Sequence, residues 1–230
     1  MRVKIHSILS SILLRKLLKK TNTMPEKIQI PQRSWIWLLI NLTIPLCGVM
    51  VLKWNLFGIL YFFWMELIAL GVFGLLRILT ALGNRPYLEL LIPRLGSAVF
   101  FAVLYGALLM LVIGYSISGF DLSEHMLSGV KSNFTGIRLG TAFLFASYLL
   151  EFSRDYLLLG KFRETHPFSI IIGTFVYTLP LACIILFVLT PYAPKAPEGV
   201  GNLFLVLGII LGKTLIEFAI ANGRSWLQAK

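Results

Sequence analysis

The sequence predicts an all-α membrane protein with six transmembrane helices, and three observations support this fold class. Long apolar segments follow one another from residue 35 onward. Hydrophobic residues make up 57% of the chain and charged residues only 13%, and the mean hydropathy is +0.83. Most Lys and Arg residues lie between the apolar segments rather than inside them. One core of a 230-residue domain could not bury this much apolar surface, so we expect lipid to be the main solvent.

The apolar segments have the length that a membrane-spanning helix needs. They are 35–52, 56–79, 96–117, 137–159, 168–190 and 202–221. A helix of about 20 residues, rising 1.5 Å per residue, crosses roughly 30 Å of hydrocarbon. Helices are expected because a backbone in lipid must satisfy its own hydrogen bonds. The first two segments are separated by residues 53–55 alone, which predicts an antiparallel hairpin.

The distribution of basic residues predicts the orientation. When the chain is threaded through six spans, sixteen Lys and Arg residues fall on the side of the N-terminus and four on the other side. Basic residues are enriched in cytoplasmic loops of membrane proteins. We therefore expect a multi-pass protein of the cell membrane with both termini in the cytoplasm. The net charge of +11 then reflects basic loops, and nucleic acid is not an expected partner.

The N-terminal stretch, residues 1–34, is expected to be a basic amphipathic or flexible cytoplasmic tail. Its apolar residues switch from one helical face to the other, which predicts two short amphipathic pieces or a frayed helix. Arg15, Lys16, Lys19 and Lys20 would hold it to anionic lipid headgroups. A disordered basic tail is the alternative. Residues 35–221 would then form the six-helix domain and 222–230 a short cytoplasmic tail.

Charged residues inside the apolar segments are the candidates for function, because charge in hydrocarbon is costly and needs a partner. Glu66 lies eleven residues before Arg77, and Lys213 lies eleven before Arg224. If both arginines mark the cytoplasmic boundary, Glu66 and Lys213 lie at one depth, about 16 Å from it. The spacing therefore predicts an ion pair between the second and sixth segments.

Two further pairs accompany these residues. Lys213 and Glu217 are spaced i,i+4, and Glu151 and Arg154 are spaced i,i+3 near the inner end of the fourth segment. Glu66, Lys213 and Glu217, with Glu151, could form a polar pathway or an ion or proton relay. The alternative is a set of structural ion pairs, with Glu151 and Arg154 reaching toward the interface.

Two pairs of glycines have the GxxxG spacing that permits close approach of helices in membranes. They are Gly136 with Gly140 and Gly208 with Gly212. Each pair would permit another helix to approach closely, and the second pair comes immediately before Lys213.

Other side chains carry no recognisable chemistry. Cys47 and Cys183 lie in apolar segments without metal-ligand spacing, and we expect them to be buried as small hydrophobic residues. Asp121, Glu124 and His125 fall in an expected outer loop and are more typical of solvated residues than of a metal site. The chain contains no HExxH, GxSxG, Walker A or glycine-rich dinucleotide motif, so we expect no cofactor and assign no catalytic residue.

The second segment resembles a known family. Trp54 ends the first hairpin, and Phe63, Trp64 and Glu66 follow the order of a Tyr-Trp-x-Glu-Asn pattern, with Phe in place of Tyr and Leu67 in place of Asn. Arg77 follows after an apolar run, and residues 156–167 resemble a basic loop after the fourth span. This pattern is similar to that of a prokaryotic family of integral membrane proteins of unknown function. The resemblance implies a multi-helix membrane fold and no particular activity.

These observations predict a polytopic membrane protein that serves as a scaffold or subunit, with a structural set of buried Glu and Lys residues. Its partners would be the lipid bilayer and another membrane protein or a second copy of the chain. The alternative is a small transporter or proton-coupled permease that uses Glu66 and Lys213. A lipid-modifying membrane enzyme is the third hypothesis.

Overall fold

The structure is a computed structural model, and it describes residues 35–52, 54, 56–83, 91–119, 124–192 and 200–228. Every regular element in these ranges is helical. The helices are α2 (Trp35–Met50), α3 (Leu56–Thr80), α4 (Leu91–Gly119), α5 (Glu124–Leu150), α6 (Lys161–Glu164), α7 (Pro167–Cys183), α8 (Thr190–Tyr192) and α9 (Val200–Gln228). Two π-helical segments, η1 (Glu151–Leu158) and η2 (Ile184–Leu189), extend α5 and α7. The expected N-terminal tail, with Arg15, Lys16, Lys19 and Lys20, lies outside the described residues.

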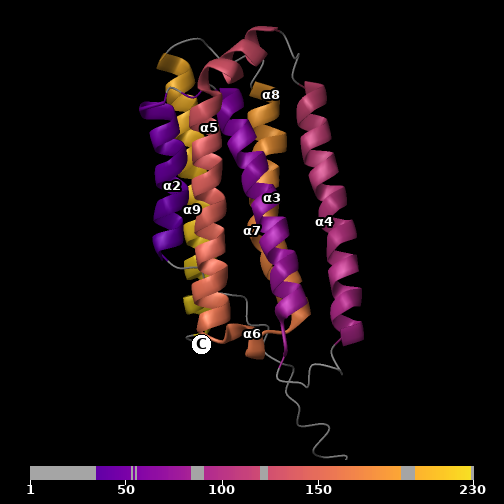
Figure 1. Cartoon of the computed structure of the whole chain (residues 1–230). Coiled ribbons are helices and arrows are strands. Elements are labelled where there is room, and N and C mark those ends of the chain that lie inside the picture. The colour runs from indigo at the N-terminus through magenta and orange to yellow at the C-terminus, as the bar shows by residue number, and fades with distance from the viewer. Residues whose placement is uncertain are drawn as a thin grey trace, which may run out of the picture.

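Each of the six expected segments is helical, and the long helices lie side by side along one axis (Figure 1). Successive helices run in opposite directions, as the short hairpin between α2 and α3 requires. Helix α3 packs against α4, α5 and α7, while α2 packs against α5 and α9. Helix α4 stands at the edge of the bundle, and α6 lies at the end where the C-terminus is found (Figure 1).

Within the part of the chain that the structure describes, three helical stretches are long and apolar enough to cross a membrane: Leu56–Thr80, Leu91–Ser118 and Pro167–Leu189. A shorter apolar stretch lies in α2, at Leu39–Met50. This finding covers half of the six spans that the sequence predicts. Helix α9 also continues to Gln228, through most of the expected tail at 222–230.

Prolines stand where helices tolerate them. Pro167 is the first residue of α7, where the missing N–H group costs no hydrogen bond. The side chain of His166 caps this helix by accepting a hydrogen bond from the backbone N–H of Phe168 at 3.3 Å. Pro45 and Pro180 lie inside α2 and α7, as expected from the sequence. Gly160 has a φ of 72°, which lets the chain turn sharply between η1 and α6.

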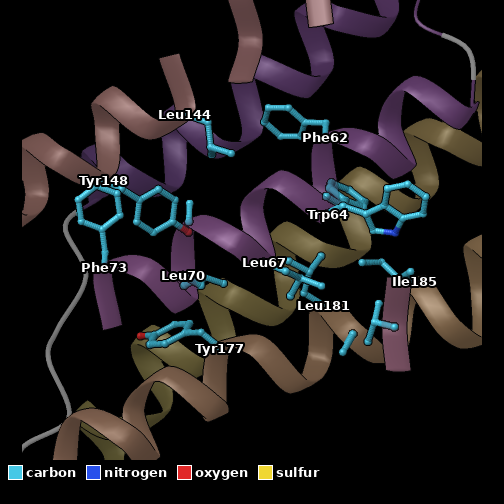
Figure 2. Packing of buried hydrophobic residues seen from close by; sticks show 14 of the residues in the cluster. Phe62, Trp64, Leu67, Leu70, Phe73, Leu144, Tyr148, Tyr177, Leu181 and Ile185 are labelled. Atoms are coloured by element: carbon cyan, nitrogen blue, oxygen red, sulfur yellow. The ribbon is translucent and has the colours of Figure 1, made fainter. Parts of the chain in front are cut away.

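The distribution of polarity is the reverse of that in a water-soluble bundle. Large apolar side chains are exposed on the outside, among them Ile92 at 82%, Met110 at 80% and Leu158 at 81%. Charged side chains lie inside, where Glu66 is 0% and Lys213 is 3% exposed. The core around them is aromatic and aliphatic, and α3 contributes more of it than any other helix (Figure 2).

The two glycine pairs differ from each other, and both cysteines differ from expectation. The Gly136 and Gly140 pair lies against the side chain of Trp54, which is only 5% exposed. No atom of the described residues would meet a Cβ within 4 Å at Gly208 or Gly212, so this pair makes no close contact with another described helix. Cys47 and Cys183 are exposed rather than buried, because they lie on outward faces of α2 and of α7. Apolar residues in lipid need not face the core, and sequence alone does not separate the two faces.

Candidate functional site

The candidate site is a buried charge cluster formed by Asn41, Glu66, Lys213 and Glu217. These side chains come from α2, α3 and α9; α2 packs against the other two helices, and the charged side chains bridge α3 and α9. Lys213 Nζ donates to Glu66 Oε1 at 2.7 Å. Glu217 Oε1 lies 3.4 Å from the same ammonium group. The amide Nδ2 of Asn41 donates to Glu66 Oε1 at a longer 3.4 Å.

The contact between Glu66 and Lys213 is the ion pair predicted from their equal depth, and it is confirmed. Their side chains are 0% and 4% exposed, so the pair lies inside the bundle rather than at its surface. Lys213 Nζ also lies 5.5 Å from the centre of the Phe63 ring, within cation–π range. Lys213 and Glu217 face the same way because they are one helical turn apart on α9.

The pairing joins elements that are far apart in the chain. Glu66 and Lys213 are 147 residues apart, so their contact fixes α3 against α9. Removing one partner of a buried ion pair leaves an uncompensated charge and typically costs about 3–5 kcal/mol. Rotating α3 or α9 about its axis would separate Glu66 from Lys213.

Asn41 is the member that sequence reasoning missed. It is 2% exposed, and its Oδ1 has no hydrogen-bond partner among the described residues. The available signal was an amide inside the apolar first segment. A buried amide in hydrocarbon needs polar partners for the same reason that a charge does. The sequence contained this signal, but nothing in it indicated that α2 would present Asn41 to Glu66.

A second polar contact lies toward the end of α3. Arg77 Nη2 forms a salt bridge with Glu151 Oε1 at 3.0 Å, and their side chains are 11% and 8% exposed. The hydroxyl of Tyr156 donates to the backbone carbonyl of Arg77 at 2.9 Å, and the ring of Tyr156 lies 5.8 Å from the guanidinium carbon. These contacts join η1 to the last turn of α3.

The i,i+3 spacing pointed to Arg154 as the partner of Glu151, but Glu151 pairs with Arg77. Glu151 opens the π-helical segment η1 and points toward α3, whereas Arg154 is 73% exposed and lies 3.9 Å from Asp155. A π-helix carries more residues per turn than an α-helix, so residues three apart no longer share a face in the usual way. The Glu151 side chain is 8% exposed and is held by Arg77.

The structure brings Glu66, Lys213 and Glu217 together and places Glu151 and Arg154 elsewhere. Across the described parts of the chain, no group of three or more His, Cys, Asp or Glu residues could hold a metal ion. The cluster contains two carboxylates, one ammonium group and one amide. These groups can fix helices, and carboxylates can also accept a proton.

Comparison with protein families gives one match. Residues 24–228 match the model described as a family of unknown function, DUF6498, and this range includes all the described helices. No curated protein and no solved structure matches the chain. The match bears out the recognition of a family without an assigned function, and it covers most of the 230 residues. The chain therefore belongs to DUF6498, a family of unknown function.

Proposed function

We propose that the chain is a six-span protein of the cell membrane that serves as a scaffold or subunit, with both termini in the cytoplasm. Three helical stretches of sufficient length and apolarity support membrane insertion. Exposed apolar side chains on the outside and charged side chains in the core support the same environment. The excess of Lys and Arg on the side of the N-terminus supports the orientation.

The buried charge cluster serves in this proposal as a clamp between α3 and α9. The observation that carries the proposal is the 2.7 Å contact between Lys213 Nζ and Glu66 Oε1, with 4% and 0% of the two side chains exposed. An ion pair with this burial favours one arrangement of the helices, because every other rotation of α3 or α9 would leave a charge without a partner in the core. A scaffold needs such a single, rigid arrangement to present a constant surface to a partner.

Exchange of the two charges tests the clamp. Lys213→Glu would bring a second carboxylate beside Glu217, so every variant in the test carries Glu217→Gln. In this background, Glu66→Lys alone and Lys213→Glu alone should lower the yield of monodisperse protein after detergent extraction. The two changes together should restore it, because the opposite charges meet again.

Arg154→Gln is the matched control, since it removes a charge that is 73% exposed. It should leave the yield unchanged. If the single charge reversals are extracted at the normal yield and with a normal thermal midpoint, the cluster does not hold the helices and the clamp proposal is wrong.

A small proton-coupled permease is the second candidate function, and one observation favours it. Two carboxylates, from Glu66 and Glu217, contact a single ammonium group, so the contacting groups have one more acid than base. A buried carboxylate without a full counter-charge can bind and release a proton, as in known proton relays of transporters. The relevant groups belong to α3 and α9, the same helices that the clamp joins.

Proton uptake distinguishes the second function from the first. Wild-type protein and the Glu66→Gln and Glu217→Gln variants are reconstituted in liposomes with an internal pH dye, and a potassium diffusion potential drives proton entry. A permease whose cluster also conducts protons without its solute predicts faster acidification with wild-type protein and loss of that excess in folded variants. Equal rates for all three proteins and for empty liposomes would exclude uncoupled proton conduction through the cluster.

A further inference from the structure

A cavity lies between α3, α5 and α7, away from the buried charge cluster. The centre of a water-sized sphere can occupy a volume of about 10 Å³ inside it. It is lined by Leu70, Phe73, Gly74, Arg77, Tyr148, Ile170, Gly173, Thr174 and Tyr177. All of these residues are buried except Arg77, whose side chain is 11% exposed. Figure 2 shows Leu70, Phe73, Tyr148 and Tyr177 gathered at one end of the core.

The lining of this cavity is unusually polar for a membrane bundle. Tyr148 and Tyr177 are 1% and 4% exposed, and their hydroxyl oxygens are buried. Arg77 pairs with Glu151 through Nη2, which leaves its buried Nε without a hydrogen-bond partner among the described residues. Thr174 Oγ1 donates to the carbonyl of Ile170 at 2.9 Å, so its oxygen lone pairs remain able to accept.

The helices pack closely around the cavity without filling it. A Cβ at Gly74 would lie 3.0 Å from Thr174 Oγ1, so α3 and α7 pack tightly at this glycine. The ring of Phe73 stacks on that of Tyr148 with a centroid distance of 5.7 Å. The cavity thus lies between closely packed helices, and its polar groups come from all three of them.

We propose that this cavity binds at least one ordered water molecule, which connects Arg77 on α3 with Tyr148 on α5 and with Thr174 and Tyr177 on α7. A charged N–H group buried without an acceptor is costly, so an acceptor at this position is favoured. Buried waters typically make about three hydrogen bonds to such groups, and the available space is sufficient for one. The Arg77 N–H group donates to the water, and the water donates to the hydroxyl oxygen of Thr174.

Hydroxyl-radical footprinting with X-rays tests the proposal on the detergent-solubilised full chain. Radicals form from water molecules in place, so a buried ring beside a bound water is oxidised, whereas a buried ring in a dry core is protected. Tyr105 is the matched control, because it is 3% exposed and its hydroxyl donates to the carbonyl of Leu67 at 2.7 Å. Tyr148 and Tyr177 should be oxidised several times faster than Tyr105. Equal rates for the three tyrosines would overturn the proposal.

A substitution at Thr174 provides a second test. Thr174→Val preserves the shape of the side chain and removes the acceptor, so oxidation of Tyr148 and Tyr177 should fall toward the Tyr105 rate. Thr214→Val is its control on α9, since Thr214 makes the same kind of bond to a backbone carbonyl, at 2.8 Å. If Thr174→Val does not fold, the wild-type comparison of the three tyrosines still decides the question. If it folds and leaves both rates unchanged, Thr174 does not hold the water.

Discussion

Gly140→Ala should destabilise the protein, and the structure indicates roughly by how much. Its Cβ would lie 2.7 Å from Cη2 and 3.1 Å from Cζ2 of Trp54, both too close for carbon atoms. Trp54 cannot swing outward easily, because it is 5% exposed and also lies against Gly48. Overpacking of this kind typically costs about 1–3 kcal/mol.

Gly212→Ala is the matched control, because it makes the same chemical change with no atom of the described residues within 4 Å of the new Cβ. Alanine is favoured over glycine inside a helix by up to about 1 kcal/mol, a gain that both variants share. The two variants should therefore differ in stability by about 1–3 kcal/mol, with Gly140→Ala the less stable.

The assay is thermal unfolding of both variants in the same detergent. In soluble domains of this size, each kcal/mol shifts the midpoint by roughly 2–4 °C, which sets the scale of the expected difference. Gly212→Ala should unfold at or above the wild-type midpoint, and Gly140→Ala several degrees below Gly212→Ala. If the two variants share one midpoint, Trp54 is not wedged against Gly140 and the packing argument fails.

Three other predictions follow from the contacts of α2, α3 and η1. Glu151→Gln should lower stability by about 1–3 kcal/mol, because it weakens a buried charge-assisted bond to Arg77. Arg154→Gln should stay within about 0.5 kcal/mol of wild type. Thermal unfolding measures both, and a lower midpoint for Arg154→Gln than for Glu151→Gln would contradict the prediction. Asn41→Leu removes a long 3.4 Å bond together with an amide oxygen that has no partner among the described residues, so we expect a change below about 1 kcal/mol. A loss as large as that of Lys213→Met would show that Asn41 is essential to the cluster. A reporter that is active only in the cytoplasm, fused after the last residue, should be active, and an inactive but full-length fusion would refute the orientation.

Much of the fold could be predicted from local properties of the sequence. The length and apolarity of the segments are sufficient to predict helices, because a backbone away from water must form its own hydrogen bonds. The helices found over residues 56–80 and 167–189 follow the expected segments to within one residue at each end. The ion pair of Glu66 and Lys213 could also be predicted, since two rare charges at one depth in hydrocarbon have few other partners.

Which face of a helix meets a neighbour depends on rotation about the helix axis, and this was decided by the tertiary structure. The sequence places Gly140 and Gly212 in equivalent motifs, yet only Gly140 receives an aromatic ring. The π-helical segment η1 directs Glu151 to Arg77, across more than seventy residues of chain, rather than to its neighbour Arg154. The helices of this chain are apolar on all sides, so hydropathy determines that a segment is helical and buried in lipid or protein. Only packing selects the side of the helix that faces the core.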